Sequence, residues 1–73
     1  MNGYQKIAVL ENQIEANFLE VVLKDRDIPF ILKSFHDSAY DGLFQLHQGW
    51  GAVYSPDEFR EEIINILEEI RTQ

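Results

Sequence analysis

The sequence predicts one α+β domain in which three strands form a sheet and two helices cover one face of it. Three observations lead to this fold class. A short β-branched run is followed by a capped helical pattern, two extended segments occupy the middle, and an amphipathic helix with a clear start signal comes last. The 73 residues suffice for one domain, near the lower size limit for a stable core.

The first strand and the first helix are predicted from the N-terminal third of the chain. Residues 4–11 contain the run Ile7-Ala8-Val9-Leu10, which predicts a strand buried on both faces or nearly so. Asn12 with Glu15 three residues later forms a capping-box pattern, so a helix is expected over 13–25. The side chains predicted to face the core are Ile14, Phe18, Val21 and Val22, with Leu19 at the edge of the stripe.

Two more strands are predicted on either side of a long loop. Pro29 ends the first helix, because a residue before proline is driven towards extended geometry. Residues 29–36 alternate as a second strand, with Phe30, Leu32 and Ser34 on one face and Ile31, Lys33 and Phe35 on the other. Loop-forming residues dominate 37–49, and 50–55 is predicted to be the third strand.

The last helix has the clearest start signal. Ser55 is predicted to cap it, Pro56 to occupy its first position, and the acids that follow to favour the positive end of the helix dipole. The helix is expected over 56–71. Its apolar stripe consists of Phe59, Ile63, Ile66, Leu67 and Ile70.

The order strand, helix, strand, strand, helix restricts the topology. A right-handed crossover makes the first two strands parallel and leaves room for the third between them, antiparallel to both. The predicted strand order is therefore 1-3-2, a ferredoxin-like fold that lacks its last strand. The first strand would then be a sheet edge on which Lys6 is the only charge that opposes pairing with another strand. We therefore expect a homodimer through Ile7–Leu10.

Composition excludes several classes of protein. Six basic against 13 acidic residues give a net charge of −7, which argues against binding nucleic acid or anionic membranes. The chain has no Cys, which excludes disulfides and thiol catalysis. Because the longest apolar run is far too short to cross a bilayer and no signal segment is recognisable, we expect a soluble, cytoplasmic protein.

No motif for catalysis or metal binding is recognisable. The acids and histidines that could approach a metal are His36, Asp37, Asp41 and His47, and their spacing matches no known coordination pattern. Ser34 or Ser38 could meet a histidine, but without the signature of a nucleophile and its base. We therefore expect no enzyme, no metal and no cofactor.

Several motifs resemble a known bacterial family. Glu11-Asn12-Gln13-Ile14-Glu15-Ala16, Asp27-Ile28-Pro29 and Val53-Tyr54-Ser55-Pro56-Asp57-Glu58 resemble those of the domain of unknown function 2007, described as signal-transducing proteins distantly similar to PII regulators. The resemblance covers nearly the whole chain. Many members have Gly in the turn where this chain has Asp27. The PII comparison implies a partner-binding loop at residues 37–49.

The predicted contact surface lies in and beside that loop. It consists of Tyr40, Leu43, Phe44, His47 and Trp50. These aromatic and apolar side chains either fold back over a small core or contact a partner. The leading hypothesis is a small non-enzymatic interaction or regulatory module that acts through protein contacts. The alternative is a small-molecule sensor with a pocket under the 37–49 loop.

Overall fold

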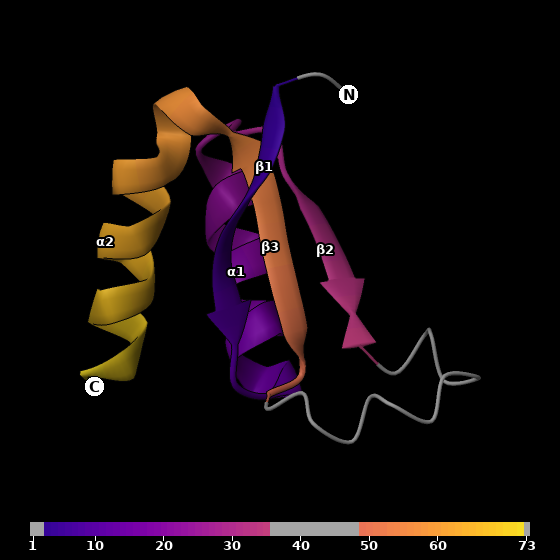
Figure 1. Cartoon of the computed structure of the whole chain (residues 1–73). Helices are drawn as coiled ribbons and strands as arrows, with labels where there is room; N and C mark the ends of the chain where they lie inside the picture. Colours follow the sequence, from indigo (N-terminus) through magenta and orange to yellow (C-terminus); the bar gives the residue numbers. More distant parts are fainter. Residues whose placement is uncertain (1–2, 36–48, 73) are drawn as a thin grey trace.

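A computed structural model of the chain describes residues 3–35 and 49–72. The fold is α+β, with a three-stranded antiparallel sheet and two α-helices, as predicted (Figure 1). A short 3-10 helix, η3, precedes the second α-helix. The elements are β1 (Tyr4–Leu10), α1 (Gln13–Asp25), β2 (Ile31–Ser34), β3 (Gly51–Pro56), η3 (Asp57–Phe59) and α2 (Arg60–Arg71).

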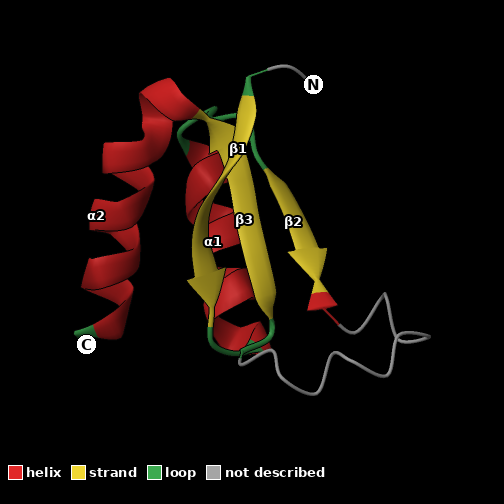
Figure 2. Ribbon diagram, in the orientation of Figure 1, coloured by secondary structure: helices red, strands yellow, loops and turns green. Residues whose placement is uncertain are grey.

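The strand order β1-β3-β2 confirms the predicted topology. Both outer strands pair antiparallel with β3, so β1 and β2 run parallel to each other on either side of it. In Figure 2, α1 lies behind the sheet and α2 beside β1. The predicted alternation of the second strand is also confirmed, since Phe30 and Leu32 pack against the core while Ile31 is exposed.

Strand β1 differs from the prediction that both of its faces are buried. Its register with β3 shifts between Lys6 and Ala8, so Ile7 is an extra residue at a β-bulge. The bulge lets Ile7 and Leu10 both enter the core, although strict alternation would separate them. Val9 stays exposed on the opposite face, and that part of the prediction is wrong.

Helix α1 begins as predicted but buries a different stripe. The Asn12 side chain accepts a hydrogen bond from the backbone N–H of Glu15 (2.9 Å), which confirms the cap. The predicted core stripe is wrong for Ile14, Phe18 and Val21, which are exposed, but Val22 packs against the core and Leu19 is buried in it, as predicted. The helix instead buries Glu15, Ala16, Leu19 and Leu23.

The turn after α1 places a non-glycine residue in the left-handed region. The N–H of Ile28 donates to the carbonyl of Leu23 (3.0 Å) and that of Asp27 to the carbonyl of Lys24 (3.2 Å), which is a Schellman motif. Asp27 has φ 59°, in the left-handed region that glycine adopts most readily. The turn therefore holds Asp27 in a backbone conformation that glycine would adopt at lower cost.

Helix α2 buries the predicted stripe but starts differently. Ile63, Ile66 and Leu67 are buried, which confirms the stripe. Ser55 is not its cap. That residue belongs to β3, is fully buried, and donates its hydroxyl hydrogen bond to the Pro29 carbonyl (2.7 Å). Tertiary contact with the segment before β2 therefore takes the hydroxyl that the local pattern assigned to the helix.

The core lies between the sheet and the two helices. Its buried side chains come from every α-helix and from β1 and β3, with Ile28 from the turn before β2. The members are Ile7, Leu10, Ala16, Leu19, Leu23, Ile28, Val53, Ile63, Ile66 and Leu67. Trp50, which directly precedes β3, is half-buried and packs against this cluster.

Candidate functional site

Most of the predicted contact surface falls outside the described residues. Tyr40, Leu43, Phe44 and His47 lie in the undescribed 36–48 segment, as do the considered metal ligands His36, Asp37 and Asp41. Trp50 is described. It is half-buried and packs against the core, and its backbone N–H donates to the Leu10 carbonyl (2.7 Å). Trp50 thus belongs at least in part to the core margin.

An arginine at the end of α2 lies beside an open surface groove. Arg71 donates from Nε to Glu15 Oε2 (2.6 Å) and from Nη2 to Glu15 Oε1 (3.0 Å), a two-pronged ion pair between the two helices. The same Nη2 donates to the Val9 carbonyl (3.0 Å). Glu15 also accepts the backbone N–H of Glu11 (2.9 Å). One side chain thus joins α2, α1 and the edge of β1.

The electrostatics of this pair follow from its geometry. The Arg71 hydrogen bonds hold the pKa of the Glu15 carboxyl below its ordinary value, against burial, which acts to raise it. The bonds to Glu15 likewise raise the pKa of Arg71. Both charges are therefore maintained at neutral pH and compensate each other.

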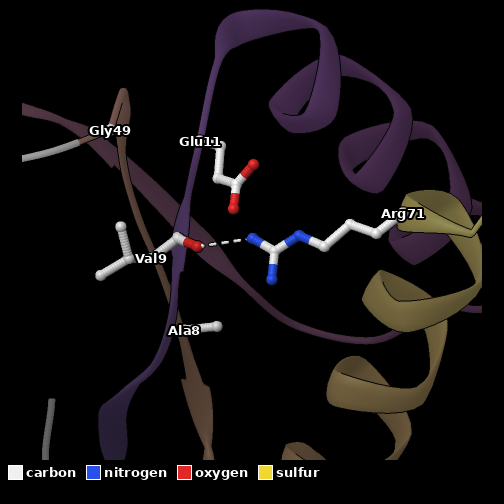
Figure 3. A pocket seen from close by; sticks show the side chains of 5 residues that line it. All are labelled: Ala8, Val9, Glu11, Gly49 and Arg71. Carbon is white, nitrogen blue, oxygen red and sulfur yellow. Dashed lines mark hydrogen bonds between the residues drawn. The ribbon is translucent and has the colours of Figure 1, made fainter.

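The groove beside this pair has a volume of about 580 Å³ and is open to solvent. Figure 3 shows its lining residues, with the Arg71 guanidinium pointing at the Val9 carbonyl. The lining is Ala8, Val9, Glu11, Gly49 and Arg71. Gly49 has φ 104°, and a Cβ there would lie 2.7 Å from the Leu10 carbonyl oxygen, so only glycine fits this approach.

The β1 edge is partly closed by the same arginine. The Leu10 carbonyl faces β3, so the Val9 N–H and carbonyl point to the free edge. The Arg71 guanidinium already donates a hydrogen bond to the Val9 carbonyl. A β1 strand of a second copy would have to displace this hydrogen bond before it could pair with the Val9 carbonyl. The homodimer through Ile7–Leu10 therefore stays a prediction.

The described residues form no cluster of the kind that binds a metal ion. In 3–35 and 49–72, no three His, Cys, Asp or Glu side chains gather as they would around a metal. The Ser55 hydroxyl donates its hydrogen bond to the Pro29 carbonyl. No helix among the described residues has the length and apolar character needed to cross a membrane.

Exposed apolar side chains are the feature that sequence reasoning missed. On α1, the exposed fractions of Ile14, Phe18 and Val21 are 72%, 52% and 66%. These residues follow the helical spacing i, i+4, i+7, which is why they were predicted to form the core stripe. Leu19 and Leu23 form a second stripe four residues apart, and this spacing was the available signal that α1 has two apolar faces.

Comparisons with protein-family models, curated proteins and solved structures found no match to this chain. The resemblance to the domain of unknown function 2007 therefore stays an interpretation of the sequence motifs.

Proposed function

We propose that this chain is a small, non-enzymatic interaction module with a regulatory role, located in the cytoplasm, and that it works through protein contacts. One observation carries the proposal. Helix α1 exposes Ile14, Phe18 and Val21 on one stripe. Large apolar side chains gathered on one exposed face are typical of protein contact surfaces, whereas scattered ones are not.

The spacing of this stripe suits another helix. Steps of four and three residues are the spacing by which two helices pack along each other. A surface helix ordinarily turns such a stripe to its own core. Here Ala16, Leu19 and Leu23 take that position, so the stripe is available to another chain.

The occupant that fits is a second copy of the chain with its α1 antiparallel. The next position on the stripe is Asp25, eleven residues after Ile14. Parallel packing would bring two Asp25 carboxylates together at the same end. Antiparallel packing moves each carboxylate to the N-terminus of the other α1, where the helix dipole favours negative charge. Two-fold dimers of this kind are the commonest symmetric assembly.

The contact should be weak. Helix α1 has 13 residues, which corresponds to a length of about 20 Å. One stripe of that length buries well under the ~800 Å² per partner of a stable interface. We therefore expect a dimer that forms and dissociates with concentration rather than a permanent one.

Sedimentation equilibrium from micromolar to millimolar concentration tests the proposal. We expect concentration-dependent dimers of the unaltered chain, and Phe18→Glu should weaken the dimer at least about tenfold. Ile31→Glu, at an exposed position on β2, is the matched control and should leave it unchanged. A monomer at the highest concentration, or equal effects of the two changes, would refute self-association through α1.

A further variant separates this contact from the predicted one through β1. Val9→Pro removes an N–H that points to the free edge, where proline is tolerated. The dimer should persist in this variant. Its loss, with the fold intact by circular dichroism, would instead support pairing through Ile7–Leu10.

A second candidate function is a small-molecule sensor, favoured by the groove beside Arg71. The groove borders Gly49, the last residue of the 37–49 loop under which a pocket was predicted. A thermal-shift screen with metabolites tests it. A large shift with one compound, lost in Arg71→Ala, would favour the sensor over the interaction module.

A further inference from the structure

The face of the sheet opposite the helices carries its own set of side chains. The strand register places Lys6, Tyr54 and Ile31 in one row across β1, β3 and β2. The next row along β3 runs from Val9 through Ala52 to Lys33. On this uncovered sheet face Ile31 is 46% exposed and Val9 37% exposed, whereas the small Ala52 side chain between Val9 and Lys33 is fully buried.

The positive charges of the described residues divide into two groups. Four basic side chains form ion pairs with carboxylates: Lys24 with Glu20, Arg26 with Glu62, Arg60 with Asp57 and Arg71 with Glu15. Lys6 and Lys33 have no carboxylate partner among the described residues. Both lie on the uncovered sheet face, in neighbouring rows on the two outer strands.

An aromatic ring lies between these two lysines. Tyr54 is opposite Lys6 in the register, and the Lys33 ammonium is 5.8 Å from the centre of its ring. The ring is half-buried and lies beside the exposed Ile31 side chain. The uncovered sheet face thus combines two lysines that have no carboxylate partner among the described residues with the aromatic surface of Tyr54 and the aliphatic surface of Ile31.

The sign of this face is opposite to that of the chain. The three strands contain two lysines and no acidic residue, a net charge of +2, whereas the whole chain has −7. All described carboxylates belong to the helices and the turns. A partner with negative charge is therefore attracted to the sheet face and repelled by the helical side.

We infer that the uncovered sheet face, defined by Lys6, Val9, Ile31, Lys33 and Tyr54, is a docking surface for an acidic protein segment. That segment carries carboxylates beside apolar side chains. The carboxylates pair with Lys6 and Lys33, and the apolar side chains cover Ile31, Val9 and the Tyr54 ring. The charge complementarity is the argument for this partner, and it is independent of the α1 contact proposed above.

A polyanion such as single-stranded nucleic acid fits this surface less well. Stacking on Tyr54 would be available to a base, but only two cations are present to neutralise phosphates. The remaining charge of the chain repels a long polyanion more strongly than a short acidic segment. An acidic protein segment is thus the partner that the observations favour.

The test uses three fluorescein-labelled probes and fluorescence anisotropy at low salt. The first is a nine-residue peptide with the core Glu-Phe-Glu-Leu-Glu between Ser and Gly residues. The second has Gln in place of each Glu, and the third is an oligodeoxythymidine of the same length. We expect the acidic peptide to bind at least about tenfold more tightly than the other two. Equal binding of the two peptides, or tighter binding of the oligonucleotide, would overturn the proposal.

Matched variants locate the contact. Replacing both exposed lysines, Lys6→Gln with Lys33→Gln, should remove the preference for the acidic peptide, and replacing both by Arg should retain it. Phe18→Glu should leave peptide binding unchanged. Loss of the α1 dimer and loss of the sheet contact are therefore detected by different variants and different measurements. On addition of the acidic peptide, the largest changes in NMR chemical shift should fall on Ile31, Lys33 and Tyr54. Shifts confined to the helices would place the contact elsewhere and refute the proposal.

Discussion

The two helices of this domain have similar lengths, 13 and 12 residues, yet they use their apolar residues differently. Helix α2 turns one stripe, centred on Ile63 and Leu67, into the core and exposes its glutamates. Helix α1 has apolar residues on two sides. Leu19 and Leu23 are fully buried, while the larger stripe through Phe18 faces outward.

The difference between the two helices shows that helical periodicity predicts the buried face only when the helix has a single apolar stripe. In α2 the polar residues leave one apolar stripe, so only one orientation buries it. In α1 two stripes share one helix, and the start of the helix decides between them. Glu15 must reach Arg71 and the Glu11 backbone, which turns the neighbouring Ala16 and Leu19 inward and Ile14 outward.

The largest expected effect tests the two stripes of α1 directly. Leu19→Ala removes a fully buried side chain and should lower the free energy of unfolding by about 2–5 kcal/mol, as should Ile63→Ala in α2. Phe18→Ala, at an exposed position, should lower it by less than about 1 kcal/mol. Urea denaturation at low protein concentration measures all three. A larger loss for Phe18→Ala than for Leu19→Ala would show that α1 buries the other stripe.

The next effect compares the N-termini of the two helices. Ser55→Ala removes the hydrogen bond that the fully buried Ser55 hydroxyl donates to the Pro29 carbonyl, and should cost about 1–2 kcal/mol. Hydrogen exchange should show the weakening in β2 and β3. If protection were lost at the first turn of α2 instead, Ser55 would be the cap that the sequence pattern suggested. Asn12→Ala, at the cap of α1, is the reference and should cost about 1 kcal/mol.

A pH-dependent effect tests the link between the two helices. Because Arg71 lowers the pKa of Glu15 in the folded chain, the pair stabilises fully above the ordinary pKa of 4.5 and loses this stabilisation as the pH falls through the folded value. Glu15→Gln should cost about 1–2 kcal/mol at neutral pH and less in acid. Glu20→Gln, which breaks the exposed pair with Lys24, should have little effect. A cost for Glu15→Gln that does not change with pH would show that packing, not charge, holds this link.

The smallest expected effect has the opposite sign. Asp27→Gly relieves the left-handed conformation at the end of α1 and should stabilise the chain by about 0.5–1 kcal/mol. Asp25→Gly, two residues earlier at the last position of α1, is the contrasting change and should destabilise. Thermal unfolding of both variants measures the difference. Destabilisation by Asp27→Gly would mean that the Asp27 side chain contributes more than its backbone costs.

Local patterns in the sequence determined the elements and their order. The Asn12 cap, the Pro29 boundary and the single stripe of α2 depend on residues a few positions apart, so sequence reasoning could read them. The 1-3-2 strand order followed because crossover handedness leaves few arrangements of five such elements. The predicted contacts at Tyr40, Leu43, Phe44 and His47 lie outside the described residues and stay predictions.

Only the tertiary structure decided which face of each element is buried and which charges are paired. The Ser55 bond to Pro29 joins residues 26 positions apart, and the Arg71 ion pair with Glu15 joins residues 56 positions apart. The bulge at Ile7 depends on the strand register. No local spacing encodes such partners. The outward stripe of α1 depends in the same way on which residues the rest of the chain covers. So does the absence of a carboxylate partner for Lys6 and Lys33 among residues 3–35 and 49–72.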